Sequence, residues 1–259
     1  MIMNKFDHNS GEQLEIDGAK IYYEMHGDQN DPALLFLHGG FGTMEDFNDV
    51  ISALEKDYRI IGIDSRGQGK STLGEQTLTY ERMQKDVESV LAHLGIDSVS
   101  IIGCSDGGIT AYRLASLTSL KIERLATIGS RWHFKNTESA KDELAGVTGE
   151  GWKKKFPDIF DIYQKLNAEP DFNALAESLV KLWLDPNSSG YPNDAIINIS
   201  CPLLIVRGDD DHIISKETVF ELSEKIEDAH LLNIPFAGHA AFVEQKEIFI
   251  ITLNEFLTA

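Results

Sequence analysis

The sequence has only two cysteines, Cys104 and Cys201, and each stands beside a run that predicts a buried strand. Two separate thiols of this kind indicate free cysteines in a reducing compartment and exclude a fold held by a disulfide framework. No apolar run comes near the roughly 18 residues that a membrane-spanning helix needs. The start of the chain is polar and lacks the apolar stretch of a signal peptide. We therefore expect a cytoplasmic protein with no membrane partner.

Basic residues are also few: 23 lysines and arginines stand against 42 aspartates and glutamates, which gives a net charge of −19. This balance excludes nucleic acid and anionic membranes as partners, because their phosphates would be repelled, and it mildly favours cationic substrates. His212 follows three aspartates, Asp209 to Asp211, but no second imidazole or thiolate stands at ligand spacing. We expect neither a metal nor another cofactor, and no feature of the sequence sets an oligomeric state.

What is present is a regular alternation of strand and helix patterns, which predicts a mostly parallel sheet with helices on both faces. With 259 residues, 42% of them hydrophobic, the chain can bury one large core. Residues 14–23 alternate around Asp17-Gly18 and predict an opening hairpin. Further strands are predicted at residues 33–37, 58–63, 99–102, 124–128, 203–206 and 230–234. Together with the two strands of the hairpin, these six make a predicted eight-stranded sheet.

The most informative segment is residues 98–111, where a β-branched run meets Gly-x-Ser-x-Gly and passes directly into a helical pattern. This order predicts a strand, a sharp turn and a helix, with Ser105 at the apex of the turn. Gly103 and Gly107 lack a Cβ at the points where such a turn brings the backbone together. The helix would direct its N–H groups and dipole at negative charge that develops beside Ser105. Ser105 is therefore the candidate nucleophile.

A nucleophilic serine needs a base and a group that orients the base, and both follow in the sequence. The predicted strand at 203–206 leads into Asp209-Asp210-Asp211. The predicted strand at 230–234 is followed by a glycine turn and His239. The chain order is therefore serine, aspartate, histidine. The residues alone leave all three aspartates open as the partner of the histidine.

A long gap between predicted strands, residues 131–198, interrupts the alternation and holds all three tryptophans, Trp132, Trp152 and Trp183. Phe156, Ile159, Phe160 and Tyr163 show helical spacing within it. We expect this cap segment to be helical and to lie above the carboxyl edge of the sheet, over Ser105. The domain prediction is a core of residues 1–130 and 199–259 and a cap of residues 131–198. Most cap aromatics are expected to attach the cap to the sheet, and a minority to line a pocket.

Two further motifs carry a family resemblance. His38-Gly39-Gly40-Phe41-Gly42 follows one predicted strand, and residues 64–71, which include Arg66, follow the next. Together with the serine turn, the aspartate loop and Gly238-His239, they make the chain resemble the α/β-hydrolase superfamily over nearly its whole length. That superfamily has an eight-stranded, mostly parallel sheet with a cap inserted after the sixth strand. It also has the chain order serine, aspartate, histidine.

The resemblance implies roles for individual residues. The usual Gly-x-x-Asp pattern selects Asp211 as the acid, beside Ser105 as nucleophile and His239 as base. The backbone N–H groups of Gly40 and Asp106 would form the oxyanion hole. His38 and Arg66 would be structural. Because a serine stands at the turn, the relatives that form an ester on an aspartate there, haloalkane dehalogenases and epoxide hydrolases, are disfavoured.

The resemblance also narrows the substrate. The serine turn is similar to that of the valacyclovir hydrolase, or biphenyl-hydrolase-like, group, in which the residue corresponding to Asp106 binds the amino group of amino-acid esters. We expect a serine hydrolase that cleaves a small carboxylic ester, with amino-acid esters as one option and Phe41 and Trp132 as candidate substrate contacts. Alternatives are a C–C bond hydrolase or lactonase on the same triad, or a non-catalytic ligand receptor of the same fold.

Overall fold

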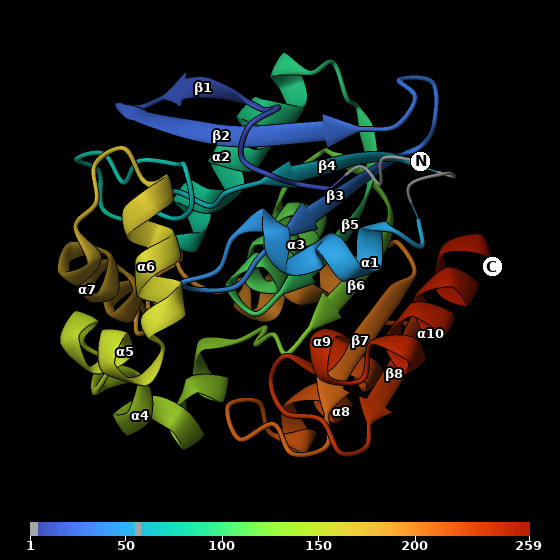
Figure 1. Cartoon of the computed structure of the whole chain (residues 1–259). Coiled ribbons are helices and arrows are strands. Elements are labelled where there is room, and N and C mark those ends of the chain that lie inside the picture. Colours follow the sequence, from blue (N-terminus) through green and yellow to red (C-terminus); the bar gives the residue numbers. More distant parts are fainter. Residues whose placement is uncertain (1–4, 55–57) are drawn as a thin grey trace.

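The computed structural model describes residues 5–54 and 58–259, and within these ranges eight strands form one sheet (Figure 1). The strand order is β1-β2-β4-β3-β5-β6-β7-β8. The pairs β1–β2 and β2–β4 are antiparallel, and all other neighbours are parallel. The strands are β1 (Glu12–Ile16), β2 (Ala19–His26), β3 (Ala33–Leu37), β4 (Arg59–Ile63), β5 (Ser98–Cys104), β6 (Lys121–Ile128), β7 (Leu203–Gly208) and β8 (Ala229–Ile234). The predicted eight-stranded, mostly parallel sheet is confirmed.

Helices cover both faces of the sheet, because the strands are apolar on both sides. In β3, Leu35 and Leu37 belong to one buried cluster, and Leu34 and Phe36 belong to another. This alternation is the two-residue period of a strand. The first cluster includes side chains of α2 (Tyr80–His93), α3 (Asp106–Leu117) and α8 (Lys216–Lys225). The second includes those of η1 (Met44–Phe47), α1 (Asn48–Ile51), α9 (Ala241–Glu244) and α10 (Lys246–Thr258).

The cap segment is helical, as predicted, and follows the sixth strand. Its elements are η2 (Phe134–Ala140), α4 (Lys141–Ala145), α5 (Gly149–Lys155), α6 (Pro157–Leu166), α7 (Phe172–Trp183) and η3 (Asn193–Asn198). Local sequence sets some of the boundaries: Pro157 occupies the first turn of α6, and Asp171 caps α7 by accepting a hydrogen bond from the N–H of Ala174. Figure 1 shows α4 to α7 grouped on the side of the molecule toward which β3 and β4 point. A third buried cluster joins them to Phe41 and Ile109.

In residues 5–54 and 58–259, no helix is long and apolar enough to cross a membrane. The same ranges contain no group of three or more histidine, cysteine, aspartate or glutamate side chains that could hold a metal ion.

Candidate active site

Ser105 lies in the turn between β5 and α3, with φ 49° and ψ −115°. This region of backbone space is unfavourable for a residue with a Cβ, so the turn holds local strain. The neighbouring glycines permit it. A Cβ on Gly103 would lie 2.6 Å from the carbonyl oxygen of Gly107, and a Cβ on Gly107 would lie 2.1 Å from that of Leu37. The N–H of Ser105 donates to the carbonyl of Ile128 in the adjacent strand, which fixes the turn against the sheet.

His239 lies in the loop between β8 and α9 and is hydrogen-bonded to Asp211. The Nδ1 atom of His239 is 2.9 Å from Oδ2 of Asp211. The other carboxylate oxygen, Oδ1, accepts the N–H groups of Ile213 at 2.8 Å and Ile214 at 3.0 Å. Asp211 is therefore held on both sides, and it presents one oxygen to the imidazole. This contact favours the tautomer that leaves Nε2 without the proton.

The three neighbouring aspartates differ in their surroundings. Asp209 contacts Lys216 at 2.7 Å, and Asp210 is exposed. Only Asp211 of the three is buried. Burial raises the pKa of Asp211, but the hydrogen bond and charge of His239 and the two backbone N–H groups outweigh burial and leave the pKa below its ordinary value. The carboxylate facing His239 is therefore ionised at neutral pH.

Ser105 and His239 line the same cavity, whose volume is about 570 Å³. Gly40 and Asp106 border it too, so the structure brings these four predicted residues together, with Asp211 behind the imidazole. The cavity extends between the sheet and the cap. Its walls are mainly apolar and aromatic and include Phe41, Trp152, Phe156, Ile159, Trp183 and Phe242.

The loop after β3 approaches Ser105 so closely that it needs glycines. A Cβ on Gly39 would lie 3.1 Å from Cβ of Ser105, and a Cβ on Gly40 would lie 2.7 Å from Oδ2 of Asp106. The same added Cβ on Gly40 would lie 3.1 Å from the Trp183 ring. The glycine loop therefore lies against both Ser105, through Gly39, and the first residue of α3, through Gly40.

His38 is structural rather than a free base. Its Nδ1 atom donates to the carbonyl oxygen of Gly39 at 2.7 Å, since that oxygen only accepts. Its Nε2 atom accepts the N–H of Ser65 at 2.9 Å. Both ring nitrogens are thus occupied, and the buried ring joins the glycine loop to the loop after β4.

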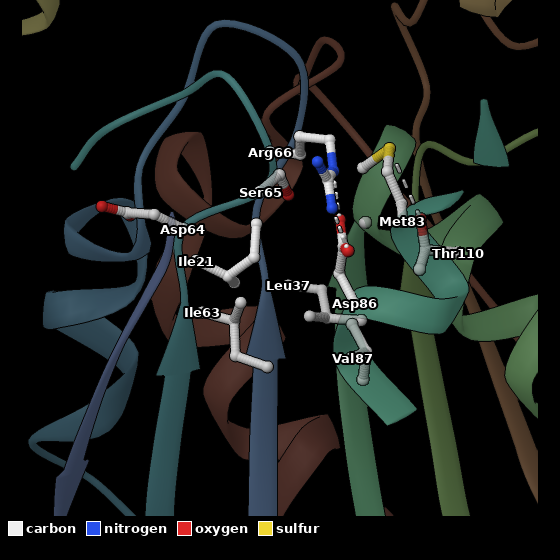
Figure 2. Close-up of a pocket in the computed structure, with 11 residues that line it drawn as sticks. Ile21, Leu37, Ile63, Asp64, Ser65, Arg66, Met83, Asp86, Val87 and Thr110 are labelled. Carbon is white, nitrogen blue, oxygen red and sulfur yellow. Dashed lines mark hydrogen bonds and ion pairs between the residues drawn. The ribbon is translucent and has the colours of Figure 1, made fainter. Parts of the chain in front are cut away.

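Arg66 is also structural (Figure 2). Its Nε and Nη2 atoms donate to the two carboxylate oxygens of Asp86 at 2.8 and 2.6 Å, and Nη2 also donates to the carbonyl of Ile16. Figure 2 shows this pair beside a small pocket of about 10 Å³, which is room for about one water molecule. The pair ties the loop after β4 to α2, away from the reacting atoms.

The side chain of Asp106 is 2% exposed and is held by two hydrogen-bond donors that the sequence pattern did not reveal. The hydroxyl of Tyr80 donates to Oδ1 at 2.7 Å, and the indole N–H of Trp183 lies 2.9 and 3.0 Å from the two oxygens. Burial raises the pKa of Asp106. No local signal marks Tyr80, because its contact with Asp106 depends on how α2 packs against α3.

The two predicted aromatic contacts have different positions. Phe41 borders the cavity, with its ring stacked on Trp152 at 4.5 Å between centroids. Trp132 does not border the cavity: it is 1% exposed within the sheet core, and its indole N–H donates to the carbonyl of Thr218. The expectation that Trp132 contacts substrate is therefore corrected, because its ring packs in the core and its polar atom already has a partner.

Comparison with known proteins agrees with this fold. A family model described as alpha/beta hydrolase fold matches residues 32–184. A putative esterase/lipase of Haemophilus influenzae is 26% identical, with 88% of this chain and 84% of that protein covered. The 3-oxoadipate enol-lactonase 1 of Acinetobacter baylyi is also 26% identical, with 93% and 94% covered. A solved hydrolase from Pseudomonas aeruginosa has a TM-score of 0.80 at 21% identity, with 98% and 100% covered. The family match includes Ser105 and Gly40 and ends before Asp211.

Proposed function

The chain belongs to the alpha/beta hydrolase fold family, and from this premise we propose that it is a serine hydrolase that cleaves a small carboxylic ester. Ser105 is the nucleophile, His239 the general base and Asp211 the acid that orients the base. The observation that carries the proposal is the opening of Ser105 and His239 into one cavity, with His239 bonded to Asp211 at 2.9 Å. The similarity to a putative esterase/lipase supports the same reaction class.

The reaction would proceed through an acyl-enzyme. The Ser105 hydroxyl attacks the ester carbonyl while Nε2 of His239 takes its proton. The imidazolium then gives this proton to the departing alcohol, and Ser105 holds the acyl group. Water attacks the acyl carbonyl next, with His239 again as base. The imidazolium then returns this proton to the Ser105 oxygen as the bond between that oxygen and the acyl group breaks, and the carboxylic acid product leaves. The ionised Asp211 stabilises the imidazolium in both halves of the cycle.

The developing oxyanion would be held by the backbone N–H groups of Gly40 and Asp106. Both residues border the cavity beside Ser105, and both are held by their surroundings: Gly40 is packed against Trp183, and Asp106 is the first residue of α3. Donors that are fixed before the reaction do not have to reorganise, and each is worth about 3–4 kcal/mol to the transition state.

Within the ester class, the general carboxylic ester is the main candidate and the amino-acid ester is the alternative. An ammonium group could pair with the Asp106 carboxylate, which borders the cavity. That carboxylate already accepts hydrogen bonds from Tyr80 and Trp183, which favours a structural role. If Asp106→Asn leaves the ratio of kcat/KM for an amino-acid ester and its des-amino analogue unchanged, the amino-acid option is dropped.

A lactone is the second candidate substrate, favoured by the similarity to an enol-lactonase over 93% of the chain. Lactone opening uses the same three residues, with the alcohol product still attached to the acyl group. C–C bond hydrolysis on the same triad is the remaining alternative. A panel of esters, lactones, amides and dienone-type compounds separates these reactions by their relative kcat/KM.

The decisive experiment measures p-nitrophenyl acetate turnover by the protein and by Ser105→Ala. We expect the substitution to lower kcat by about 10⁴-fold or more, because the nucleophile is lost. Ser116→Ala, which removes another hydroxyl of α3, is the matched control and should keep full activity. A fluorophosphonate probe should label Ser105 alone. Full turnover by Ser105→Ala would overturn the proposal, and absence of turnover on the whole panel would favour the non-catalytic receptor.

A further inference from the structure

Arg207 is a charged residue in the interior of the sheet. It belongs to β7, a strand that lies between β6 and β8 and whose other residues are apolar (Figure 1). The residue is 4% exposed. In the described part of the chain, all of its hydrogen-bond partners are backbone carbonyls or an amide oxygen, and none is a carboxylate. Because burial of a charge is costly unless its hydrogen bonds are satisfied, these contacts determine what Arg207 does.

The partners of Arg207 surround Asp211, the proposed catalytic acid. The Nε atom donates to the carbonyl of Ile214 at 2.7 Å, and Nη2 donates to the carbonyl of Asp211 at 2.7 Å. The Nη1 atom donates to the carbonyl of Asp209 and to the side-chain oxygen of Asn233 in β8, both at 3.2 Å. One side chain therefore holds the backbone of Asp211, the backbone on both sides of it, and the neighbouring strand.

Residues 209–214, which we name the acid loop, are fixed from a second direction as well. The Nη2 atom of Arg131, another buried arginine, donates to the carbonyl of Ile213 at 2.9 Å. Together the two arginines hold the carbonyls of four of the six residues in the acid loop. On its inner side, the Asp211 carboxylate accepts the N–H groups of Ile213 and Ile214. The acid loop is thus folded around its own carboxylate and held from outside by arginines.

The acid loop is also bonded to the segment that leads to His239. The N–H of Asp209 donates to the carbonyl of Ile234, and the N–H of Asp210 donates to the carbonyl of Ala237. The 2.9 Å contact between the proposed acid and the proposed base therefore depends on the shape of the acid loop.

We propose that Arg207 is a positioning residue, which fixes the acid loop so that Asp211 holds the imidazole of His239 in the orientation and tautomer that proton transfer requires. Arg207 does not border the large cavity, so it acts through Asp211 and not on the substrate. An arginine suits this task, because its planar fork directs several donors at once. The inference rests on the proposed hydrolase reaction for its connection to turnover, but the tautomer of His239 is measured without a substrate.

The kinetic test compares Arg207→Met with Arg113→Met. Arg113 is also 4% exposed and donates to two backbone carbonyls, but these lie in the cap segment. Both variants lose buried hydrogen bonds, so activity is expressed per folded molecule at a temperature where circular dichroism shows both to be folded. Arg207→Met should lower kcat for p-nitrophenyl acetate by about tenfold or more, because a misplaced base slows proton transfer, whereas Arg113→Met should change it by less than about twofold.

The Michaelis constant separates positioning from substrate binding. His239 is the base in both halves of the proposed cycle, so acylation and deacylation should slow together in Arg207→Met. We therefore expect KM to stay within about twofold of its original value.

The second test is spectroscopic and needs no turnover. Imidazole ¹⁵N shifts at a pH where the ring is neutral report which nitrogen carries the proton, and His239→Gln identifies the signals. The protein and Arg113→Met should carry the proton of His239 on Nδ1, facing Asp211. Arg207→Met should shift the ring toward the tautomer protonated on Nε2, which a histidine free in water prefers.

Arg207→Lys is the conservative variant. It keeps the charge but offers one nitrogen in place of three, so it should change kcat and the tautomer less than Arg207→Met does. Should Arg207→Met not fold, the lysine variant is judged by the same two measurements. The proposal is overturned if the tautomer of His239 is unchanged, or if kcat falls no further than in Arg113→Met. A changed tautomer without turnover of any ester would uphold the positioning role and contradict the proposed ester hydrolysis instead.

Discussion

At the scale of single residues, several positions near the proposed catalytic groups require glycine, because a Cβ atom there would collide with its surroundings. Gly39, Gly107 and Gly129 all occupy places where a Cβ would meet the proposed catalytic groups or the backbone that holds them. Gly129 is the most direct case. It follows β6 with φ 57°, and a Cβ there would lie 2.9 Å from Cε1 and 3.0 Å from Nδ1 of His239. The imidazole therefore lies against bare backbone.

Gly129→Ala should lower kcat strongly and the free energy of unfolding only modestly. The added methyl would displace the His239 ring, and a shift of about 1 Å in a proton-transfer group can cost about 100-fold in rate. The positive φ would cost about 1 kcal/mol of folding free energy by itself. The measurements are kcat for p-nitrophenyl acetate and the free energy of unfolding in urea.

Gly95→Ala is the matched control for this change. Gly95 has φ 65°, close to that of Gly129, but a Cβ built on it meets no atom within 4 Å. The control should therefore lose only the folding free energy that the positive φ costs, about 1 kcal/mol, and keep full activity. Equal activity losses in the two variants would show that backbone strain, and not contact with His239, explains the effect.

At the scale of elements, the sequence predicts the strands well and the lining of the cavity poorly. The strand patterns depend on local alternation and burial, and β3 has the predicted bounds, 33–37. The order of Ser105, Asp211 and His239 is set by the turns that follow β5, β7 and β8, which are local features too. In parallel strands these turns meet at one edge of the sheet, so the sequence could predict that these three residues lie close together.

The contacts of the cap could not be predicted, because they join residues far apart in the chain. Trp132 and Trp183 have the same residue type and lie in the same segment. One packs in the sheet core against the carbonyl of Thr218, and the other donates to Asp106. Composition and spacing carry no information that separates them. Gln68 likewise has nothing in its neighbourhood in the sequence to show that its amide is buried and, among the described residues, unpaired.

One such contact fixes the end of the cap to α3. The Nη1 atom of Arg113 donates to the carbonyls of Gly190 at 2.7 Å and Ser188 at 2.9 Å, and its Nε atom donates to Gln84 at 3.0 Å. Arg113 is 4% exposed. Its loss would leave carbonyl groups without partners in a buried place. Arg113→Met should therefore lower the free energy of unfolding by about 2–4 kcal/mol in urea denaturation.

Arg124→Met provides the comparison for Arg113→Met. Arg124 also donates to a backbone carbonyl, that of Ala259, but this contact is exposed. We expect a change within about 0.5 kcal/mol, as for other surface positions. Similar losses in the two variants would mean that Arg113 adds nothing beyond an ordinary surface contact.

At the scale of the whole molecule, the first described residues are tied to the sheet by a buried histidine. His8 is 1% exposed, and its two ring nitrogens contact the carboxylates of Glu45 and Asp64. Lys70 donates to its backbone carbonyl. Burial lowers the pKa of His8, but the hydrogen bonds and charges of the two carboxylates outweigh burial and raise it to about 9. His8 is therefore an imidazolium at neutral pH.

The raised pKa predicts how stability depends on pH. A histidine whose pKa is higher in the folded than in the unfolded state stabilises the fold fully below the unfolded value, about 6.5, and this stabilisation is lost as the pH rises through about 9. The contribution is about 2–3 kcal/mol, since Glu45 is partly exposed to solvent. Unfolding in urea at pH 6 and pH 9.5 should show this loss in the protein and not in His8→Gln. His230→Gln, at an exposed histidine, should keep it.

The net charge of −19 acts on the approach of substrate and not on the fold. A negative protein attracts cations over a distance of about 10 Å at 0.1 M salt, and added salt shortens that range. The lining of the large cavity includes the exposed residues Glu143, Lys155 and His212, so the charges there are mixed and the attraction comes from the molecule as a whole.

The dependence of kcat/KM on salt tests this attraction. For p-nitrophenyl esters that differ only in an acyl charge, kcat/KM of the cationic ester should fall about two- to tenfold between low and high salt. That of the neutral ester should stay level, and that of the anionic ester should rise. The opposite order would mean that Lys155, and not the overall charge, determines which esters approach, and Lys155→Met would then abolish the salt dependence.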